Sequence, residues 1–216
     1  MKFEKFQYIY PPRPETSTKF GGDLYRKIQR DQSHIAQLKI NGQRNLIYIY
    51  PDGKIELWNR HKEHHRNYKT PGWLEAELKA AVKVEAGKFT VIDSELVHAK
   101  DASVKNTFYL YDLLVLNGDY LLGSTYIDRH RALTDIMGTS ELGDGWRYVL
   151  SEHIWVAGNI TPDLWDEMWK WTDISWVEGY VLKNPMGRLL PGFTSNNNSS
   201  WMIRCRKRSE SGHVRF

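Results

Sequence analysis

Residues 35–50 read IAQLKINGQRNLIYIY, two apolar runs separated by the polar segment Asn41-Gly42-Gln43. The composition of each run predicts a β-strand, over 35–40 and 44–50, and the polar segment predicts a tight turn that makes them a hairpin. Lys39 stands at the mouth of this hairpin, and a small polar residue, a glycine and Arg44 follow it. That arrangement suits an amine nucleophile that attacks a phosphate. A lysine before Asn-Gly is also a common way to enter a turn, so the short pattern alone leaves both interpretations open.

The composition limits the class of protein. The chain has 216 residues, 41% of them hydrophobic and 13% aromatic, which is typical of one globular domain with a full core. A net charge of +4 is compatible with a polyanionic partner but does not require one. The single cysteine, Cys205, excludes an internal disulfide and a cysteine-rich zinc site. Without a membrane-length apolar run or a signal-peptide core, we expect a cytoplasmic protein.

The rest of the chain is predicted to be a mixture of strands and helices, with strands in the majority. Because the two kinds of element do not alternate, mainly antiparallel sheets with helices packed outside fit better than a doubly wound parallel sheet. The predicted helices cover 23–30, 71–85, 126–137 and 161–171, and the further strands cover 54–59, 89–97, 107–115, 147–156, 178–184 and 201–207.

Two predicted strands carry polar groups that a pure core strand would avoid. Asp93 and Glu95 lie on the same face of the strand over 89–97, which therefore faces either solvent or a pocket that uses the charges. Tyr111 and Asp112 lie in an aromatic-rich strand, where Tyr111 is either a core side chain or a platform for a nucleobase.

Cations gather at several predicted strand ends. Arg60 is either a phosphate-binding fork or a solvated strand end. The histidines of the stretch 61–65 suggest solvation or phosphate contact more than zinc, because no second ligand cluster accompanies them. Arg204 and Arg206 alternate with apolar residues, which predicts both arginines on one face of a strand. Glu178 and Lys183 are five residues apart, so a regular strand would place them on opposite faces unless Gly179 carries a bulge.

In order and spacing, these segments resemble the nucleotidyltransferase domain of the ATP-dependent DNA ligase family, within the superfamily of RNA ligases and mRNA capping enzymes. The segment from Lys39 to Arg44 resembles the family's nucleophile motif, Lys-x-Asp-Gly-x-Arg. The resemblance spans about residues 8 to 208. The other matching segments are Asn59-Arg60, Asp93-Ser94-Glu95-Leu96, Phe108 to Leu114 with Asn117-Gly118, Asp128 to Arg131, and Glu178 to Lys183.

The resemblance implies an α+β, ATP-grasp-like fold in which two mainly antiparallel sheets flank a nucleotide cleft. It also implies ATP as the AMP donor, Mg²⁺ or Mn²⁺, a covalent lysine–AMP intermediate and nicked duplex DNA as the partner. The implied roles are Lys39 as nucleophile, Gln37 and Tyr111 on the adenine, Glu95 on the ribose, Arg44 on the ribose or nick phosphate, Arg60 on a phosphate, Glu178 on the metal, and Lys183, Arg204 and Arg206 on the α-phosphate.

The chain departs from the family pattern at several positions. Asn41 replaces the usual aspartate, as it does in some RNA-repair ligases, and Ser94 replaces a glycine. Arg204 and Arg206 fill places where lysines are usual, and arginine keeps the charge but not the compact ammonium geometry. Trp201 lies one residue further from these cations than the family's tryptophan.

The length predicts one nucleotidyltransferase domain over 1–216, without the OB-fold that most DNA ligases add. A separate protein is then a candidate for the duplex clamp. The short segment before Lys39 favours ATP over NAD as cofactor. An RNA ligase, a capping-type guanylyltransferase and a nucleic-acid end-binding module without activity stay open as alternatives, as does a nucleoid-associated or virus-encoded protein.

Overall fold

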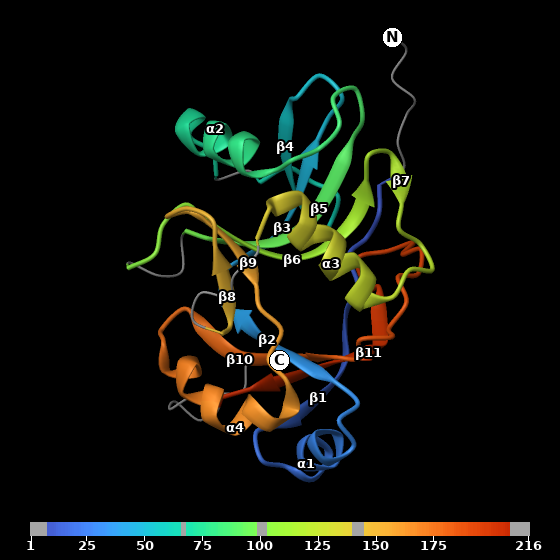
Figure 1. Ribbon diagram of the computed structural model, residues 1–216, viewed down its shortest axis with the longest axis vertical. Helices are drawn as coiled ribbons and strands as arrows, with labels where there is room; N and C mark the ends of the chain where they lie inside the picture. The colour runs from blue at the N-terminus through green and yellow to red at the C-terminus, as the bar shows by residue number, and fades with distance from the viewer. Residues whose placement is uncertain (1–7, 66–67, 99–102, 140–144, 208–216) are drawn as a thin grey trace.

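The computed structural model describes residues 8–65, 68–98, 103–139 and 145–207, which form two β-sheets with helices packed outside them (Figure 1). The predicted α+β class is confirmed. Each sheet is mixed, because one parallel pair of strands joins otherwise antiparallel neighbours. None of the helices in these ranges is long and apolar enough to cross a membrane.

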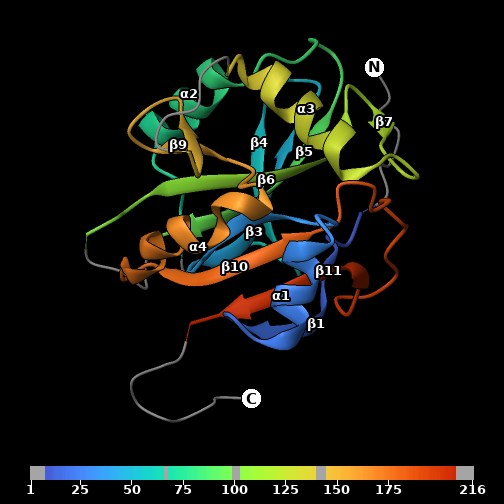
Figure 2. The same cartoon turned by 60° about the horizontal axis from the view of Figure 1, so that its bottom comes forward.

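The smaller sheet has four strands and carries the nucleophile candidate on its last strand. Their order is β1 (Arg13–Lys19), β11 (Asn198–Arg206), β10 (Val177–Lys183) and β2 (Ile35–Ile40). Helix α1 (Asp23–Arg30) and the short helix α4 (Trp165–Met168) lie over this sheet (Figure 2). Buried aromatic side chains, Tyr25, Trp165 and Tyr180 among them, fill the space between.

The larger sheet has seven strands, six of them on one path. The path runs β4 (Ile55–Asn59), β3 (Gln43–Ile49), β5 (Thr90–Val97), β6 (Thr107–Leu116), β9 (Ile154–Ala157) and β8 (Arg147–Val149), and the short β7 (Asp119–Tyr120) pairs with β6. Helices α2 (Gly72–Ala81) and α3 (Tyr126–Met137) lie on this side of the molecule (Figure 1). An aliphatic cluster that includes Leu74, Leu78 and Leu133 packs them against the strands.

The predicted hairpin over 35–50 is wrong, although both of its strands are present. Strand β2 pairs with β10, whereas β3 pairs with β4 and β5, so the turn at Asn41-Gly42 carries the chain from one sheet to the other. The Asn41 amide donates to the Trp176 carbonyl, and a Cβ at Gly42 would lie 2.5 Å from the Leu96 carbonyl oxygen. Local alternation predicts strands, but these distant contacts decide which strands pair.

Other element boundaries follow the sequence with four corrections, the first of which is that the strand expected over 201–207 is β11 and begins at Asn198. The strands at 54–59, 89–97 and 107–115 and the helices at 23–30 and 126–137 lie within about a residue of their predicted bounds. The helix expected over 71–85 ends at Ala81, because Val82 is extended and the Lys83 amide donates to the Ile136 carbonyl. Trp73, in the first turn of this helix, is 49% exposed.

The other two corrections concern segments that bend. The strand expected over 147–156 is the antiparallel pair β8 and β9, because a turn held by the hydroxyl of Ser151 separates them. The helix expected over 161–171 divides into a 3₁₀ turn (Pro162–Leu164), α4 and a second 3₁₀ turn (Trp169–Asp173). Pro162 occupies its first turn as predicted, but the Thr161 side chain makes no capping hydrogen bond.

Candidate functional site

All ten side chains predicted for the site line two adjoining hollows whose walls come from both sheets. The smaller hollow encloses about 80 Å³, and the larger, more open one about 490 Å³. Gln37, Tyr111 and Lys183 line the smaller hollow, Arg60, Glu178 and Arg206 line the larger one, and Lys39, Arg44, Glu95 and Arg204 line both.

Lys39 lies near the end of β2, where the two hollows meet. Its Nζ donates to Oε2 of Glu178 on the neighbouring strand β10, and 20% of its side chain is exposed. The Arg206 Nε lies 3.4 Å from the same carboxylate oxygen. Glu178 therefore holds the lysine amine at the border of the two hollows, and the lysine side chain stays partly accessible.

A bulge in β10 brings Glu178 to the larger hollow and Lys183 to the smaller one beside it. The pairing of β10 with β2 shifts register between Val177 and Gly179, and Gly179 has a φ of +136°. A Cβ there would lie 2.1 Å from the Cys205 carbonyl oxygen, so only glycine fits this position. On a regular strand, a spacing of five residues would place these two charged side chains on opposite faces. The bulge breaks that alternation, so both side chains reach the site.

Arg44 and Asp93 form a bidentate ion pair under the smaller hollow. The Arg44 Nε lies 2.6 Å from Oδ1 of Asp93, a second guanidinium nitrogen donates to Oδ2, and that nitrogen also lies 3.0 Å from the Pro12 carbonyl. Asp93 is buried and lines the hollow with Glu95. The shared face expected for these two acids is therefore a pocket wall rather than a solvated surface.

Tyr111 forms an aromatic wall of the smaller hollow. Its hydroxyl donates to Oε2 of Glu95 at 3.2 Å, and burial raises the pKa of Tyr111 well above the ordinary value for tyrosine. The phenol is therefore a neutral donor that holds Glu95 in place. The Arg44 guanidinium lies 5.9 Å from the ring centroid. The ring presents a flat surface of the kind on which a nucleobase stacks.

Lys183 is a buried cation at the back of the smaller hollow. It is 3% exposed, and its Nζ lies 4.3 Å from the Tyr126 ring centroid and 5.7 Å from that of Tyr111. Burial lowers the pKa of Lys183 to about 7, although Asp112 and Asp93 oppose the shift. A cation that loses its charge near neutral pH, beside an aromatic wall, suits an anionic ligand that supplies the missing countercharge.

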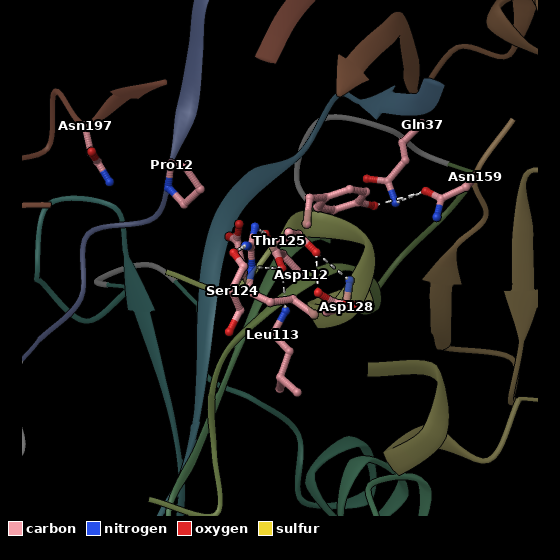
Figure 3. Close-up of polar contacts among 12 residues, drawn as sticks. Pro12, Gln37, Asp112, Leu113, Ser124, Thr125, Asp128, Asn159 and Asn197 are labelled. Atoms are coloured by element: carbon pink, nitrogen blue, oxygen red, sulfur yellow. Dashed lines mark hydrogen bonds and ion pairs between the residues drawn. The ribbon is translucent and has the colours of Figure 1, made fainter. Parts of the chain in front are cut away.

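Asp112 is neutralised by an arginine of α3. Arg129, which is 1% exposed, donates to both carboxylate oxygens of Asp112 at 2.9 Å, and its third nitrogen lies 2.6 Å from the Ser124 carbonyl (Figure 3). The pair ties α3 to β6 beneath the site. The pair joins the segments Phe108 to Leu114 and Asp128 to Arg131, both of which resemble family motifs. Neither Asp112 nor Arg129 was predicted for the site.

Sequence reasoning missed two polar residues next to Gln37. The Gln37 Nε2 lies 3.2 Å from Oδ1 of Asn159 (Figure 3). The Asn159 Nδ2 lies 3.1 Å from Nδ1 of His130. Asn159 follows β9, 122 residues after Gln37, and His130 lies on α3. No motif or spacing marks these residues, because only the packing of α3 and β9 against β2 brings them together.

The larger hollow is predominantly basic. Arg206 is exposed, while Ile203 and Cys205 are buried, so the predicted division of this strand into a cationic and an apolar face is confirmed. Burial lowers the pKa of Arg204 from its ordinary value, and the neighbouring Arg206 acts in the same direction. Arg60 is exposed, and its Nε lies 3.1 Å from Nε2 of His61. Lys207 and Arg208 continue the run of cations in the sequence, and Arg208 falls outside the described residues.

The described residues contain no group of three or more histidine, cysteine or acidic side chains that would hold a metal by themselves. Magnesium commonly uses one or two carboxylates and takes its other ligands from substrate phosphates and water. Glu178 and Glu95 both line the larger hollow, so the residues present fit that kind of site. The histidines at 61 and 65 line the same hollow without forming a zinc cluster.

Comparison with solved structures identifies the architecture. The ligase domain of LigD from M. tuberculosis matches over 92% of this chain with a TM-score of 0.57 and 17% sequence identity. The chain has the ligase nucleotidyltransferase fold. A Lig E DNA ligase matches this fold over 92% of the chain (TM-score 0.54, 16% identity), and the bacteriophage T7 ATP-dependent DNA ligase, solved with ATP, over 91% (TM-score 0.56, 11% identity).

The ligase nucleotidyltransferase fold accounts for only part of those proteins. The chain spans 60% of the LigD ligase domain, 70% of the Lig E structure and 68% of the T7 enzyme. Neither the protein-family models nor the curated proteins give a match. At these identities the likeness establishes the fold, and the chemistry has to be argued from the site.

Proposed function

We propose that the chain is the core of an ATP-dependent polynucleotide ligase that forms lysyl-AMP and seals nicks with 5′-phosphate and 3′-hydroxyl ends in DNA. The observation that carries this proposal is the position of the Lys39 amine. It lies where an enclosed hollow with an aromatic wall meets an open, basic one. A base and a polyphosphate bound across these two spaces would place their α-phosphorus beside the amine.

The covalent step is an in-line displacement at phosphorus. The unprotonated amine of Lys39 forms a bond to the α-phosphorus of ATP, the bond to the bridging oxygen breaks, and pyrophosphate leaves with that oxygen. The amine releases its proton to solvent. AMP then passes to the 5′-phosphate of the nick, and a 3′-hydroxyl displaces it to seal the strand. Because the reaction joins an amine to a polyanion, neutralising the phosphates is the main task of the site.

The proposed roles follow the two hollows. Tyr111 stacks on adenine, Gln37 binds its edge, and Glu95 accepts from the ribose. Lys183, Arg204 and Arg206 neutralise the α-phosphate, while Arg44 contacts the ribose or the nick phosphate and Arg60 another phosphate. Glu178, with the phosphates and water, would hold a divalent ion, which supplies charge neutralisation at the phosphates when bound.

The test is labelling with [α-³²P]ATP and magnesium. The wild-type protein should acquire a covalent label that survives denaturing electrophoresis and is released by acid, as expected of a phosphoramidate; Lys39→Ala should lose this label completely while it keeps the wild-type melting temperature. Lys170→Ala, an exposed lysine that lines neither hollow, should label normally. A label that survives Lys39→Ala would assign the nucleophile to another residue.

One observation keeps a second function open. Asn41 stands where an aspartate is usual, and arginines stand where two lysines are usual. A nucleic-acid end-binding module without activity would bind nicks in a salt-dependent manner but form no adduct with any nucleotide. Comparing ATP with GTP labelling, and nicked DNA with nicked RNA, separates the DNA ligase from an RNA ligase or capping-type guanylyltransferase. A nick that is sealed only after another protein is added would support a separate duplex clamp.

A further inference from the structure

We propose that Asn159 and His130 make the smaller hollow selective for adenine, because they fix which end of the Gln37 side-chain amide faces the bound base. The inference rests on the proposed nucleotide site and assigns two residues that the ligase motifs do not contain. Neither residue lines the hollow; each acts through Gln37 as a positioning residue.

A glutamine alone does not distinguish adenine from guanine. One end of its amide accepts hydrogen bonds and the other donates them, and rotation by half a turn exchanges the two. Adenine presents an exocyclic amino donor at the position where guanine presents a carbonyl acceptor. Selectivity by Gln37 therefore requires that its amide be held in one orientation.

The orientation is determined first at His130. Its Nε2 lies 2.7 Å from the Ala157 carbonyl oxygen, which only accepts, so Nε2 carries the proton. The ring is 4% exposed, and burial lowers the pKa of His130, although the hydrogen bond to Ala157 opposes this. A neutral ring with a proton on Nε2 has an unprotonated Nδ1, which accepts.

The unprotonated Nδ1 of His130 determines the orientation of the Asn159 amide, and the Asn159 amide determines that of Gln37. The Asn159 atom at 3.1 Å from Nδ1 of His130 must be its amino nitrogen, so the other end of this amide is its oxygen. That oxygen accepts from the Tyr126 hydroxyl at 3.0 Å and from the Gln37 amino group at 3.2 Å (Figure 3). The Gln37 Oε1 is left as a buried acceptor without a hydrogen-bond partner in the structure.

The backbone keeps Asn159 at this distance from Gln37. The residues next to each of them, Ala36 and Ile160, exchange two backbone hydrogen bonds of 2.9 and 2.8 Å. The Gly158 amide donates to the Trp146 carbonyl at 2.8 Å, and a Cβ at Gly158 would lie 2.7 Å from the Trp146 carbonyl carbon. The buried acceptor of Gln37, a residue that lines the smaller hollow, is thus held in one orientation, which is complementary to the amino group of adenine.

The test compares ATP and GTP binding by calorimetry in wild-type protein and three variants. Wild type should bind ATP more tightly, and Asn159→Leu should reduce the ratio of the GTP to the ATP dissociation constant about tenfold, because the Gln37 amide is then free to rotate. Adding Gln37→Glu to Asn159→Leu should restore the preference, since a carboxylate presents acceptors in either orientation. Lys170→Ala, an exposed lysine outside the smaller hollow, is the control and should keep the wild-type ratio.

Three results would each overturn the inference. The first is an Asn159→Leu protein that keeps the wild-type ratio, the second is a double variant that stays unselective, and the third is a wild-type protein that binds both nucleotides equally. The restored ratio in the double variant excludes misfolding as the cause of the loss. Wild-type protein that binds ATP selectively but never forms the labelled lysine adduct would contradict the proposed function and leave this inference standing.

Discussion

Lys183 shows how a single side chain couples stability to the proposed chemistry. It lies buried at the back of the smaller hollow, against two aromatic rings. The unfolded chain binds a proton at Lys183 up to a pKa of about 10.4, whereas the folded chain releases it above about 7. Between these values the unfolded state binds more protons, so stability rises with pH there and is lowest at or below pH 7.

Replacing Lys183 by methionine should therefore stabilise the protein while it removes a proposed phosphate ligand. We expect Lys183→Met to raise the free energy of unfolding at pH 7 by about 1–3 kcal/mol, because the buried ammonium group is gone. The gain should shrink toward pH 10. Urea unfolding at pH 6.5, 8 and 9.5 measures it, and labelling with ATP should show loss of the adduct. A variant less stable than wild type at pH 6.5 would contradict this account.

The candidate site shows which residues a sequence reveals. Lys39, Glu95 and Glu178 carry charges in apolar strands, and a charge in such a strand demands an explanation from the sequence alone. Asn159 and His130 lie in polar or helical stretches where such residues are common. Their significance is a matter of hydrogen-bond direction, which depends on contacts across 122 and 29 residues.

At the scale of the element, strand β10 depends on its bulge. Gly179 has a positive φ, and the Cys205 carbonyl oxygen occupies the space that a Cβ would need. Because the overlapping atom belongs to the backbone, no side-chain rotation would relieve the clash. The bulge also sets the position of Glu178, which holds the Lys39 amine. Stability and the geometry of the nucleophile are thus determined by the same irregularity.

Gly179→Ala should consequently reduce both the stability of the fold and the rate of adduct formation. We expect a loss of about 3 kcal/mol or more in the free energy of unfolding, because the backbone must move to admit the methyl group. The rate of adduct formation should fall by more than stability alone explains, when measured at a temperature where the variant is folded. Gly72→Ala is the matched control, since a Cβ there meets nothing within 4 Å at the start of α2 and should be neutral or slightly stabilising. Equal stabilities for the two variants would exclude the bulge as a constraint.

The elements also show where local reasoning ends. The helix over 126–137 was predictable to the residue, because Thr125 caps it and Gly138 ends it in the left-handed conformation. The helix after Pro71 was predicted too long, because its end depends on the contact of Lys83 with Ile136 rather than on a local stop signal. The hairpin at Asn41-Gly42 was wrong for the same reason: pairing across two sheets is a tertiary property.

At the scale of the whole molecule, charge is concentrated rather than abundant. The net charge is only +4, yet Arg13, Arg60, Arg204 and Arg206 line one hollow. A local concentration of cations at a cleft binds a nucleic-acid backbone by releasing its counterions, and the number of contacts sets the dependence on salt.

Nick binding should report these contacts individually. Arg60→Ala and Arg206→Ala should each weaken binding to a nicked duplex and lower the slope of log K against log salt concentration by about 1. Lys170→Ala, outside the hollow, should change neither quantity. Fluorescence anisotropy between 50 and 200 mM salt measures the slopes. Unchanged slopes for both arginine variants would place the nucleic acid on another face.

The crossing of the chain at Asn41-Gly42 has a mechanical consequence. Lys39 belongs to the smaller sheet, whereas Tyr111 and Glu95 belong to the larger one, so an AMP bonded to the lysine and stacked on the tyrosine would brace the two halves of the molecule against each other. Under the proposed reaction, the brace would form when ATP is consumed and would be lost when AMP passes from the lysine to the 5′-phosphate of the nick. Each catalytic cycle would then stiffen the protein while the lysine carries the nucleotide and loosen it once the nucleotide has been transferred.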